Sequence, residues 1–205
     1  MRRNINNMSG FTLIEILVSV AILVILASGF LGIQYIFSQN QVGAWKEYSN
    51  IEDTNQIVSN FIKETRDARQ SETGSYLLVS ASDQEIIFFS DYDYDNVVER
   101  IRYTLTQTNL IKGVIEPAGS PATYQLASEK TKTLSTYIRN STSPLFYYYN
   151  KDWPEDKVNN PLPLAQRIAD TKIVKISLII NKKANDPGSN FSLDSQSTIR
   201  MLKID

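Results

Sequence analysis

The 205-residue chain has 21 basic and 22 acidic residues, which gives a formal net charge of −1 at pH 7. It contains no cysteine and no histidine, so disulfides, thiolate nucleophiles, Cys or His metal ligands and a histidine general base are excluded. The sequence shows no basic stripe of the kind that binds nucleic acid. Composition therefore disfavours both an enzyme and a nucleic-acid-binding protein, and we expect no cofactor.

The N-terminal region combines a short basic segment with a long apolar run. Residues 1–10 carry Arg2 and Arg3, and the apolar run from Ile16 to Phe37 is about the length that crosses a bilayer as a helix. Positive charge before the run predicts a cytoplasmic N-terminus and a C-terminal domain outside, in a single-pass cytoplasmic (inner) membrane protein. Removal of residues 1–10 leaves 19 of the 21 basic residues against 22 acidic ones, a mildly acidic mature chain.

A secretory signal and a signal anchor are the ordinary interpretations of such a run. A secretory signal has a small-residue cleavage site after the apolar stretch, whereas here the small residue, Gly10, comes before it. Glu15 argues against a plain signal anchor, because an ionised carboxylate is costly in a membrane helix. Its position near the cytoplasmic end reduces that cost, so the charge alone does not decide between the interpretations.

The sequence Gly10-Phe11-Thr-Leu-Ile-Glu15, followed by the apolar run, resembles the class III signal of type IV prepilins and type II secretion pseudopilins. This resemblance implies that prepilin peptidase cleaves after Gly10 and methylates the new N-terminus at Phe11. It also implies that the Glu15 carboxylate pairs with the Phe11 amine of a neighbouring subunit during assembly. Along one helix Glu15 lies about 6 Å from Phe11, which is roughly one turn.

Helical character continues beyond the membrane-spanning run. Apolar residues recur at spacings of three, four and seven on an otherwise polar segment that ends near Arg69. The stripe consists of Trp45, Tyr48, Ile51, Ile57, Val58, Phe61 and Ile62. We therefore predict a leader at residues 1–10, a transmembrane and filament-core half of the helix at 11–38, and an amphipathic half at 39–69.

Residues 70–205 are predicted to form one globular domain built on an antiparallel β-sheet. Runs rich in β-branched and aromatic residues predict strands at Tyr76–Ser80, Glu85–Ser90, Val97–Leu105, Leu110–Ile115, Leu145–Tyr149, Ile173–Asn181 and Thr198–Lys203. The second to fourth are expected to form a meander, and Ser128–Arg139 to contain a short helix or turn. A long N-terminal helix packed on this sheet gives an α+β, pilin-like fold.

Two further stretches of the domain are similar to the minor pilin group related to PilW and pseudopilin J. The first runs from Phe88 through Glu99–Tyr103 to Gly113. The second is Leu145–Tyr148, with the late strands at Val174–Ile180 and Thr198–Arg200. This similarity implies a minor rather than a major subunit, and it covers most of the chain as a loose pattern.

One group of acidic residues suggests a metal site. Its members alternate along the chain, with a further acid close behind: Asp91, Asp93, Asp95 and Glu99. The spacing resembles the opening of a calcium loop, Asp-x-Asp-x-Asp-Gly. However, Asn96 occupies the position of the glycine, and Arg102 that of the bidentate glutamate. A solvated hairpin turn explains the same residues, since Asp and Asn favour turns.

The sequence thus predicts a non-enzymatic structural subunit, a minor pilin of a type IV pilus-like filament. The expected partners are prepilin peptidase, other pilin or pseudopilin subunits, the inner-membrane assembly platform and the membrane, with no nucleic acid. A pseudopilin of a type II secretion system and a competence-pilus subunit remain open alternatives, because all of these proteins share the leader and the helix. A membrane-anchored binding or enzymatic domain that uses the leader for export alone is the third interpretation.

Overall fold

The computed structural model describes residues 11–140, 142–181 and 190–202, and for residues 42–48 it describes the backbone alone. Gly10, the leader arginines and the side chains of Trp45 and Tyr48 lie outside the described residues. The chain divides into two compact units, with the boundary between Tyr48 and Ser49. The first contains the apolar N-terminal part of a helix, and the second contains the rest of that helix and all of the strands.

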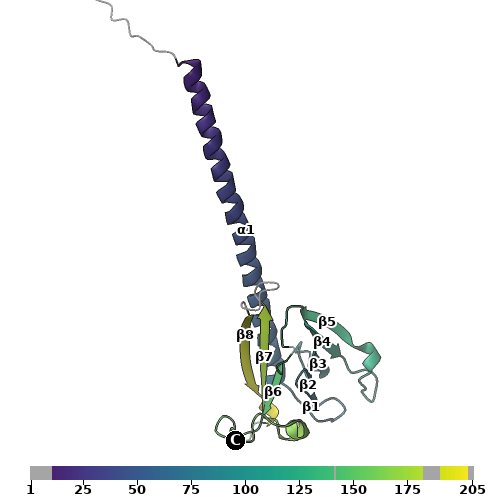
Figure 1. Ribbon diagram of the computed structural model, residues 1–205. Helices are drawn as coiled ribbons and strands as arrows, with labels where there is room; N and C mark the ends of the chain where they lie inside the picture. Colours follow the sequence, from purple (N-terminus) through teal and green to yellow (C-terminus); the bar gives the residue numbers. More distant parts are fainter. Residues whose placement is uncertain (1–10, 141, 182–189, 203–205) are drawn as a thin grey trace, which may run out of the picture. The chain divides into compact units, whose positions relative to one another are not determined.

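Helix α1 spans Leu13–Arg66 and is the longest element of the structure (Figure 1). Lys63 and Arg66 lie in its last turn, where positive charge is favoured by the helix dipole. The helix ends before the predicted Arg69 because the backbone there joins the sheet. The Arg69 N–H donates to the Phe89 carbonyl at 3.0 Å, which is incompatible with a further helical turn.

The first sheet has five antiparallel strands in sequence order (Figure 1). These are β1 (Leu78–Ala81), β2 (Glu85–Ser90), β3 (Glu99–Thr106), β4 (Asn109–Ile115) and β5 (Lys130–Ser135). The predicted meander of adjacent strands is confirmed: β2 pairs with β3, and β3 pairs with β4. Its register places Phe88 opposite Ile101 and Ser90 opposite Glu99, so the β2–β3 connection begins directly after Ser90.

Strand β5 corrects one prediction, since Ser128–Arg139 was expected to hold a helix or a turn. The segment forms an edge strand that follows a short 3-10 turn, η1 (Leu126–Ser128). Four of its six residues are exposed and they alternate Lys and Thr, so the apolar alternation that marks a half-buried strand is missing. Pairing with β4, which sets Lys132 opposite Lys112, holds the strand in place.

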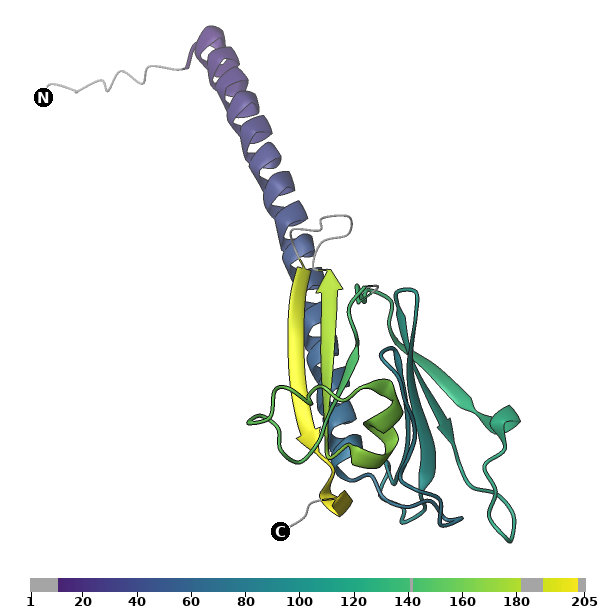
Figure 2. The ribbon, with the colours of Figure 1, turned by 60° about the horizontal axis from the view of Figure 1, so that its bottom comes forward.

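The second sheet contains three antiparallel strands, β6 (Phe146–Tyr149), β7 (Ile173–Asn181) and β8 (Asn190–Thr198), with β7 in the centre. The prediction of a last strand at Thr198–Lys203 is wrong, because the strand ends at Thr198 and a 3-10 turn, η4 (Arg200–Leu202), follows. Strand β8 is a polar edge strand, so its sequence lacks a strong strand signal. Between β6 and β7 lie a 3-10 turn, η2 (Leu164–Gln166), and one helical turn, α2 (Arg167–Asp170) (Figure 2).

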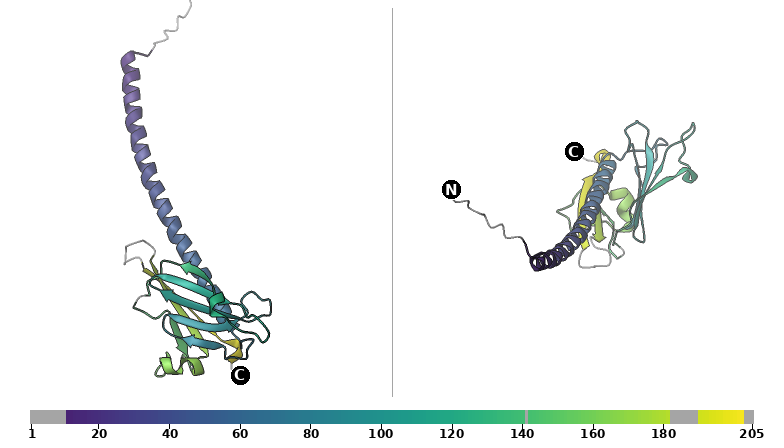
Figure 3. Two further views of the ribbon diagram at one scale, coloured as in Figure 1. Left: turned by 90° about the vertical axis from the view of Figure 1, so that its right-hand side faces the viewer. Right: turned by 90° about the horizontal axis from the view of Figure 1, so that it is seen from above.

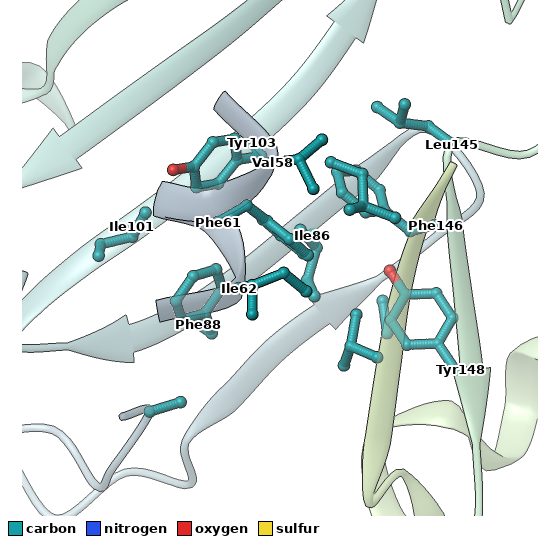
Figure 4. Close-up of a cluster of buried hydrophobic side chains, with 14 of the residues drawn as sticks. Val58, Phe61, Ile62, Ile86, Phe88, Ile101, Tyr103, Leu145, Phe146 and Tyr148 are labelled. Atoms are coloured by element: carbon teal, nitrogen blue, oxygen red, sulfur yellow. The ribbon is translucent and has the colours of Figure 1, made fainter. Parts of the chain in front are cut away.

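The hydrophobic core joins both sheets to the C-terminal part of α1 (Figure 4). Phe61 is fully buried, and its ring lies 5.2 Å from Tyr103 of the first sheet and 5.3 Å from Phe146 of the second, measured between centroids. Val58 and Ile62 are buried on the same side of the helix. The α+β pilin-like architecture is confirmed, with two antiparallel sheets where one was predicted (Figure 3, left).

A small polar network is buried beside this core. The Tyr103 hydroxyl donates to Glu64 Oε2 at 2.8 Å, and Lys112 Nζ donates to Glu64 Oε1 at 2.6 Å. Both carboxylate oxygens of this helix residue are therefore used by side chains of β3 and β4. The network fixes which helix residue faces the sheet, since a buried carboxylate without donors is costly.

Candidate functional site

The first turn of α1 is held by a reciprocal pair of hydrogen bonds between Thr12 and Glu15. The Thr12 N–H donates to Glu15 Oε2 at 2.8 Å, and the Glu15 N–H donates to Thr12 Oγ1 at 3.4 Å. This is a capping box, in which Thr12 is the N-cap and Glu15 is the third helical residue. Thr12 is a residue that the sequence interpretation missed, although Thr-x-x-Glu before an apolar run is its usual signal.

Phe11 lies outside the helix and is 84% exposed. Because α1 begins at Leu13, the backbone at Phe11 and Thr12 is not part of the helical segment. The predicted cleavage bond lies between Gly10 and Phe11, directly before this non-helical stretch. Gly10 itself is outside the described residues, so the cleavage and methylation sites stay predictions.

Glu15 already has a partner within its own chain. Its Oε2 accepts from both the N–H and the hydroxyl of Thr12, at 2.8 and 2.9 Å. Among the described residues both bonds go to Oε2, and the side chain is exposed. An external donor would therefore meet a carboxylate that is already oriented along the helix start, and the assembly role of Glu15 stays a prediction.

The helical segment Leu13–Gln41, hereafter the apolar half of α1, is long and apolar enough to span a membrane. None of its most apolar window is buried within the chain. Its exposed side chains include Leu17, Leu23, Leu26, Phe30 and Ile33. An apolar surface of this extent requires a bilayer or an apolar protein partner to cover it.

The β2–β3 connection carries the predicted calcium residues, and the structure gathers three of the four. One carboxylate oxygen from each of Asp91, Asp93 and Glu99 lies within 4.8 Å of the other two. We call these three residues the acidic trio. Asp95 is not part of it, because its Oδ1 accepts from the Val97 N–H at 2.7 Å and closes a local turn.

Of the two residues that depart from the calcium-loop pattern, Asn96 adopts the backbone conformation of the glycine it replaces, whereas Arg102 does not supply a metal ligand. Asn96 has φ +70°, so it adopts the left-handed conformation that a glycine would supply. Arg102, at the position of the bidentate glutamate, lies in β3 and forms a two-bond ion pair with Glu129 at 2.7 and 2.8 Å. The connection is therefore a hairpin with an acidic cluster and lacks the full ligand set of an EF-hand loop.

Glu99 is the most buried member of the acidic trio, at 1% exposure. Desolvation raises its pKa to about 7, and the nearby charges of Asp93 and Asp95 add to that shift. The Tyr92 N–H donates to Glu99 Oε2, at a long 3.3 Å. In the part of the chain that the structure describes, no Lys or Arg forms an ion pair with Glu99.

A groove of about 560 Å³ lies between the Ser49–Arg66 part of α1 and strands β4 and β5. Its lining is mixed, with Asp53 and Asn60 on the helix and Lys112 and Lys132 on the strands. Lys112 is held by Glu64 and by the face of Tyr92, whose ring centroid is 4.4 Å from Nζ. Lys112 is thus already engaged by neighbouring side chains of the chain itself.

Comparison with known families finds one match, at the N-terminus. Residues 5–31 match the model of the prokaryotic N-terminal methylation motif. This range contains the predicted cleavage bond, the Thr12–Glu15 capping box and much of the apolar half of α1. No curated protein matches the chain.

Proposed function

We propose that this chain, a type IV pilin-like prepilin, functions as a minor pilin: a non-enzymatic structural subunit of a type IV pilus-like filament. The methylation motif at residues 5–31 overlaps a long apolar helix that the described residues leave exposed, and this observation carries the proposal. An apolar helix of this kind can first anchor the subunit in the membrane and then pack among the same helices of other subunits.

In the proposed maturation, prepilin peptidase hydrolyses the Gly10–Phe11 bond and then methylates the Phe11 amine. Support comes from the start of α1 at Leu13, which leaves Phe11 outside the helical hydrogen-bond ladder and exposed. The Thr12–Glu15 capping box supports this arrangement, because it fixes where the helix starts.

Cleavage also changes the charge at the helix start. Removal of residues 1–10 deletes Arg2 and Arg3 and creates an α-amine at Phe11, four residues before Glu15 and just ahead of the start of α1. We propose that the amine of one subunit pairs with Glu15 of its neighbour as the helices pack. Pairing in a low-dielectric bundle offsets two charges that are each costly there alone.

The proposed partners follow from this cycle: prepilin peptidase, other pilin or pseudopilin subunits and an inner-membrane assembly platform. The proposed topology has a cytoplasmic N-terminus, a single membrane span and the Ser49–Asp205 unit outside. A pseudopilin in a type II secretion system and a competence-pilus subunit would use the same motif and helix. The minor-subunit assignment rests on the loose similarity of the β-domain to PilW and pseudopilin J.

Replacement of Glu15 tests the assembly role. Glu15→Ala is expected to be processed normally yet to lose incorporation into sheared filaments, because the amine of the neighbour no longer finds its carboxylate. Ser19→Ala is the matched control: it lies one turn further along α1, and its hydroxyl donates to the Glu15 carbonyl. Unaltered incorporation of the Glu15 variant would contradict the proposed pairing of Glu15 with the Phe11 amine.

Immunogold labelling tests the place of the subunit. A minor pilin is expected as sparse labelling, at filament tips or at wide intervals. Dense labelling along the shaft would contradict the minor-subunit assignment, and protein that is processed but never found in surface filaments would favour the pseudopilin alternative.

A further inference from the structure

The acidic trio combines burial with an unbalanced charge. It brings three carboxylates together at the end of the first sheet, where Ser90 pairs with Glu99 and the β2–β3 connection begins. Among the described residues, Asp91 alone of the three has a cationic partner, Arg69. Three carboxylates with one guanidinium leave an excess negative charge in a partly desolvated place, and such charge requires a proton or a cation.

Asp91 supplies a second observation that points to a ligand. Its side chain is 10% exposed, and its Oδ2 accepts from Arg69 and from the Asn96 N–H, the latter at 3.1 Å. Its Oδ1 is buried and has no hydrogen-bond partner in the part of the chain that the structure describes. A buried carboxylate oxygen without a donor is rare in native structures, and an ion that it contacts is one explanation for it.

The dimensions suit a calcium ion. Calcium–oxygen distances of roughly 2.3–2.6 Å place two ligands on opposite sides of the ion about 4.6–5.2 Å apart. One carboxylate oxygen from each member of the acidic trio lies within 4.8 Å of the other two, so a small inward shift of the side chains brings all three into contact with one ion. The chain offers neither Cys nor His, and an all-oxygen site of this kind selects a hard cation.

We propose that Asp91, Asp93 and Glu99 bind a divalent cation of the calcium type, with Asp91 held in place by Arg69. Asp93 is the solvent-exposed ligand of the site, and Glu99 is the buried one. Asp95 takes no part, since its carboxylate closes the turn to Val97. Without a bidentate glutamate at position 102 the site belongs to the weak class, with Kd on the order of 10⁻⁴–10⁻³ M.

The test is a titration of the full-length chain in detergent with CaCl₂, followed by calorimetry and thermal unfolding. Wild type is expected to release or absorb heat with a stoichiometry of one, and its unfolding midpoint to rise by roughly 3–6 °C at ten times Kd. NaCl at matched ionic strength should not reproduce the shift. Asp93→Asn, at an exposed position that tolerates the change, should abolish both signals.

Two further variants sharpen the result. Asp95→Asn is the matched control, because it removes an acid from the same loop but not from the acidic trio, and it should retain the calcium response. Glu99→Gln should lose the response while unfolding at a higher temperature than wild type without calcium, since the buried charge is gone. If Glu99→Gln does not fold, Asp93→Asn carries the test alone.

Two outcomes overturn the proposal. If Arg69 turns its Nε, which is also buried and has no partner among the described residues, toward Asp91 Oδ1, a two-bond ion pair satisfies that oxygen. Calcium then gives neither heat nor a thermal shift at concentrations up to about 10 mM, well above the expected Kd. Equal loss of the response in Asp93→Asn and Asp95→Asn would show diffuse charge screening in place of a site.

Discussion

The two parts of α1 use the same backbone hydrogen bonding but are made for different surroundings. The apolar half, Leu13–Gln41, is apolar on every side and exposed along its length. The part from Ser49 to Arg66, hereafter the domain half, buries one stripe that includes Ile57, Val58 and Phe61, and keeps its other sides polar. The breadth of the apolar surface therefore tells which part folds against its own domain and which requires a membrane or other subunits.

The largest effect on stability is expected from Phe61→Ala in the domain half. Phe61 is fully buried and contacts rings from both sheets, so its removal leaves a cavity where three elements meet. We expect a loss of about 3–5 kcal/mol in the free energy of unfolding, measured by urea denaturation of the full chain in detergent. Phe30→Ala, the same change at a 61% exposed position of the apolar half, should leave that value unchanged. Equal losses would erase the distinction between the two halves.

A charge in the apolar half should weaken membrane insertion and leave the stability of the β-domain unchanged. Leu23→Arg places a guanidinium near the middle of the predicted span, at a cost of roughly 3 kcal/mol for membrane insertion. We expect a smaller membrane-bound fraction on cell fractionation, with unchanged urea denaturation of the β-domain. Glu52→Arg, an exposed position of the domain half, is the control and should leave fractionation unaltered. Full membrane retention of the Leu23 variant would contradict a spanning role.

A smaller loss of stability is expected when the polar contact between the domain half and the first sheet is removed. Tyr103→Phe removes the hydroxyl that donates to Glu64, and the buried carboxylate keeps only its bond from Lys112. The expected destabilisation is about 1–3 kcal/mol, read from the shift of the urea midpoint. Tyr137→Phe, at a half-exposed tyrosine, should shift it far less. A neutral Tyr103 variant would mean that Lys112 alone satisfies the carboxylate.

The smallest effect on stability is expected from the ion pair between Arg102 and Glu129, whose contribution depends on pH. The two bonds from Arg102 hold the pKa of Glu129 below its usual value of 4.5. A lowered folded-state pKa contributes stability above the unfolded pKa, and this contribution is lost as the pH falls through the folded value. Wild type should therefore exceed Glu129→Gln in stability at about pH 6.5, and the gap should narrow at about pH 3. A gap that does not change with pH would show that the carboxylate charge contributes nothing.

Strands with a strong apolar signal were predictable: buried residues alternate along β7, and β2 is a continuous buried apolar run. The bounds of β2 (Glu85–Ser90) and β7 (Ile173–Asn181) agree with the sequence prediction. β5 and β8 were missed or misplaced, since both are polar edge strands whose position depends on the neighbour they pair with. The division into two sheets also depends on contacts between distant segments, which local patterns do not encode.

The candidate sites show the same limit. The methylation motif is contiguous, so the sequence alone reveals it, and Thr12 was recognisable from its spacing to Glu15. The acidic trio is not contiguous: Glu99 joins Asp91 and Asp93 only because the β2–β3 register brings it back. Asp95 looked equivalent to its neighbours in sequence, and only the hydrogen bond to Val97 sets it apart.

The most direct test of the account is mass spectrometry of the N-terminal peptide of the protein from cells that contain prepilin peptidase. The account predicts a peptide that begins at Phe11 and carries one methyl group on its α-amine, and a peptidase-deficient strain should retain residues 1–10. An intact leader in the peptidase-containing cells, or a new N-terminus beyond the apolar half of α1, would contradict the prepilin maturation on which the proposed function rests.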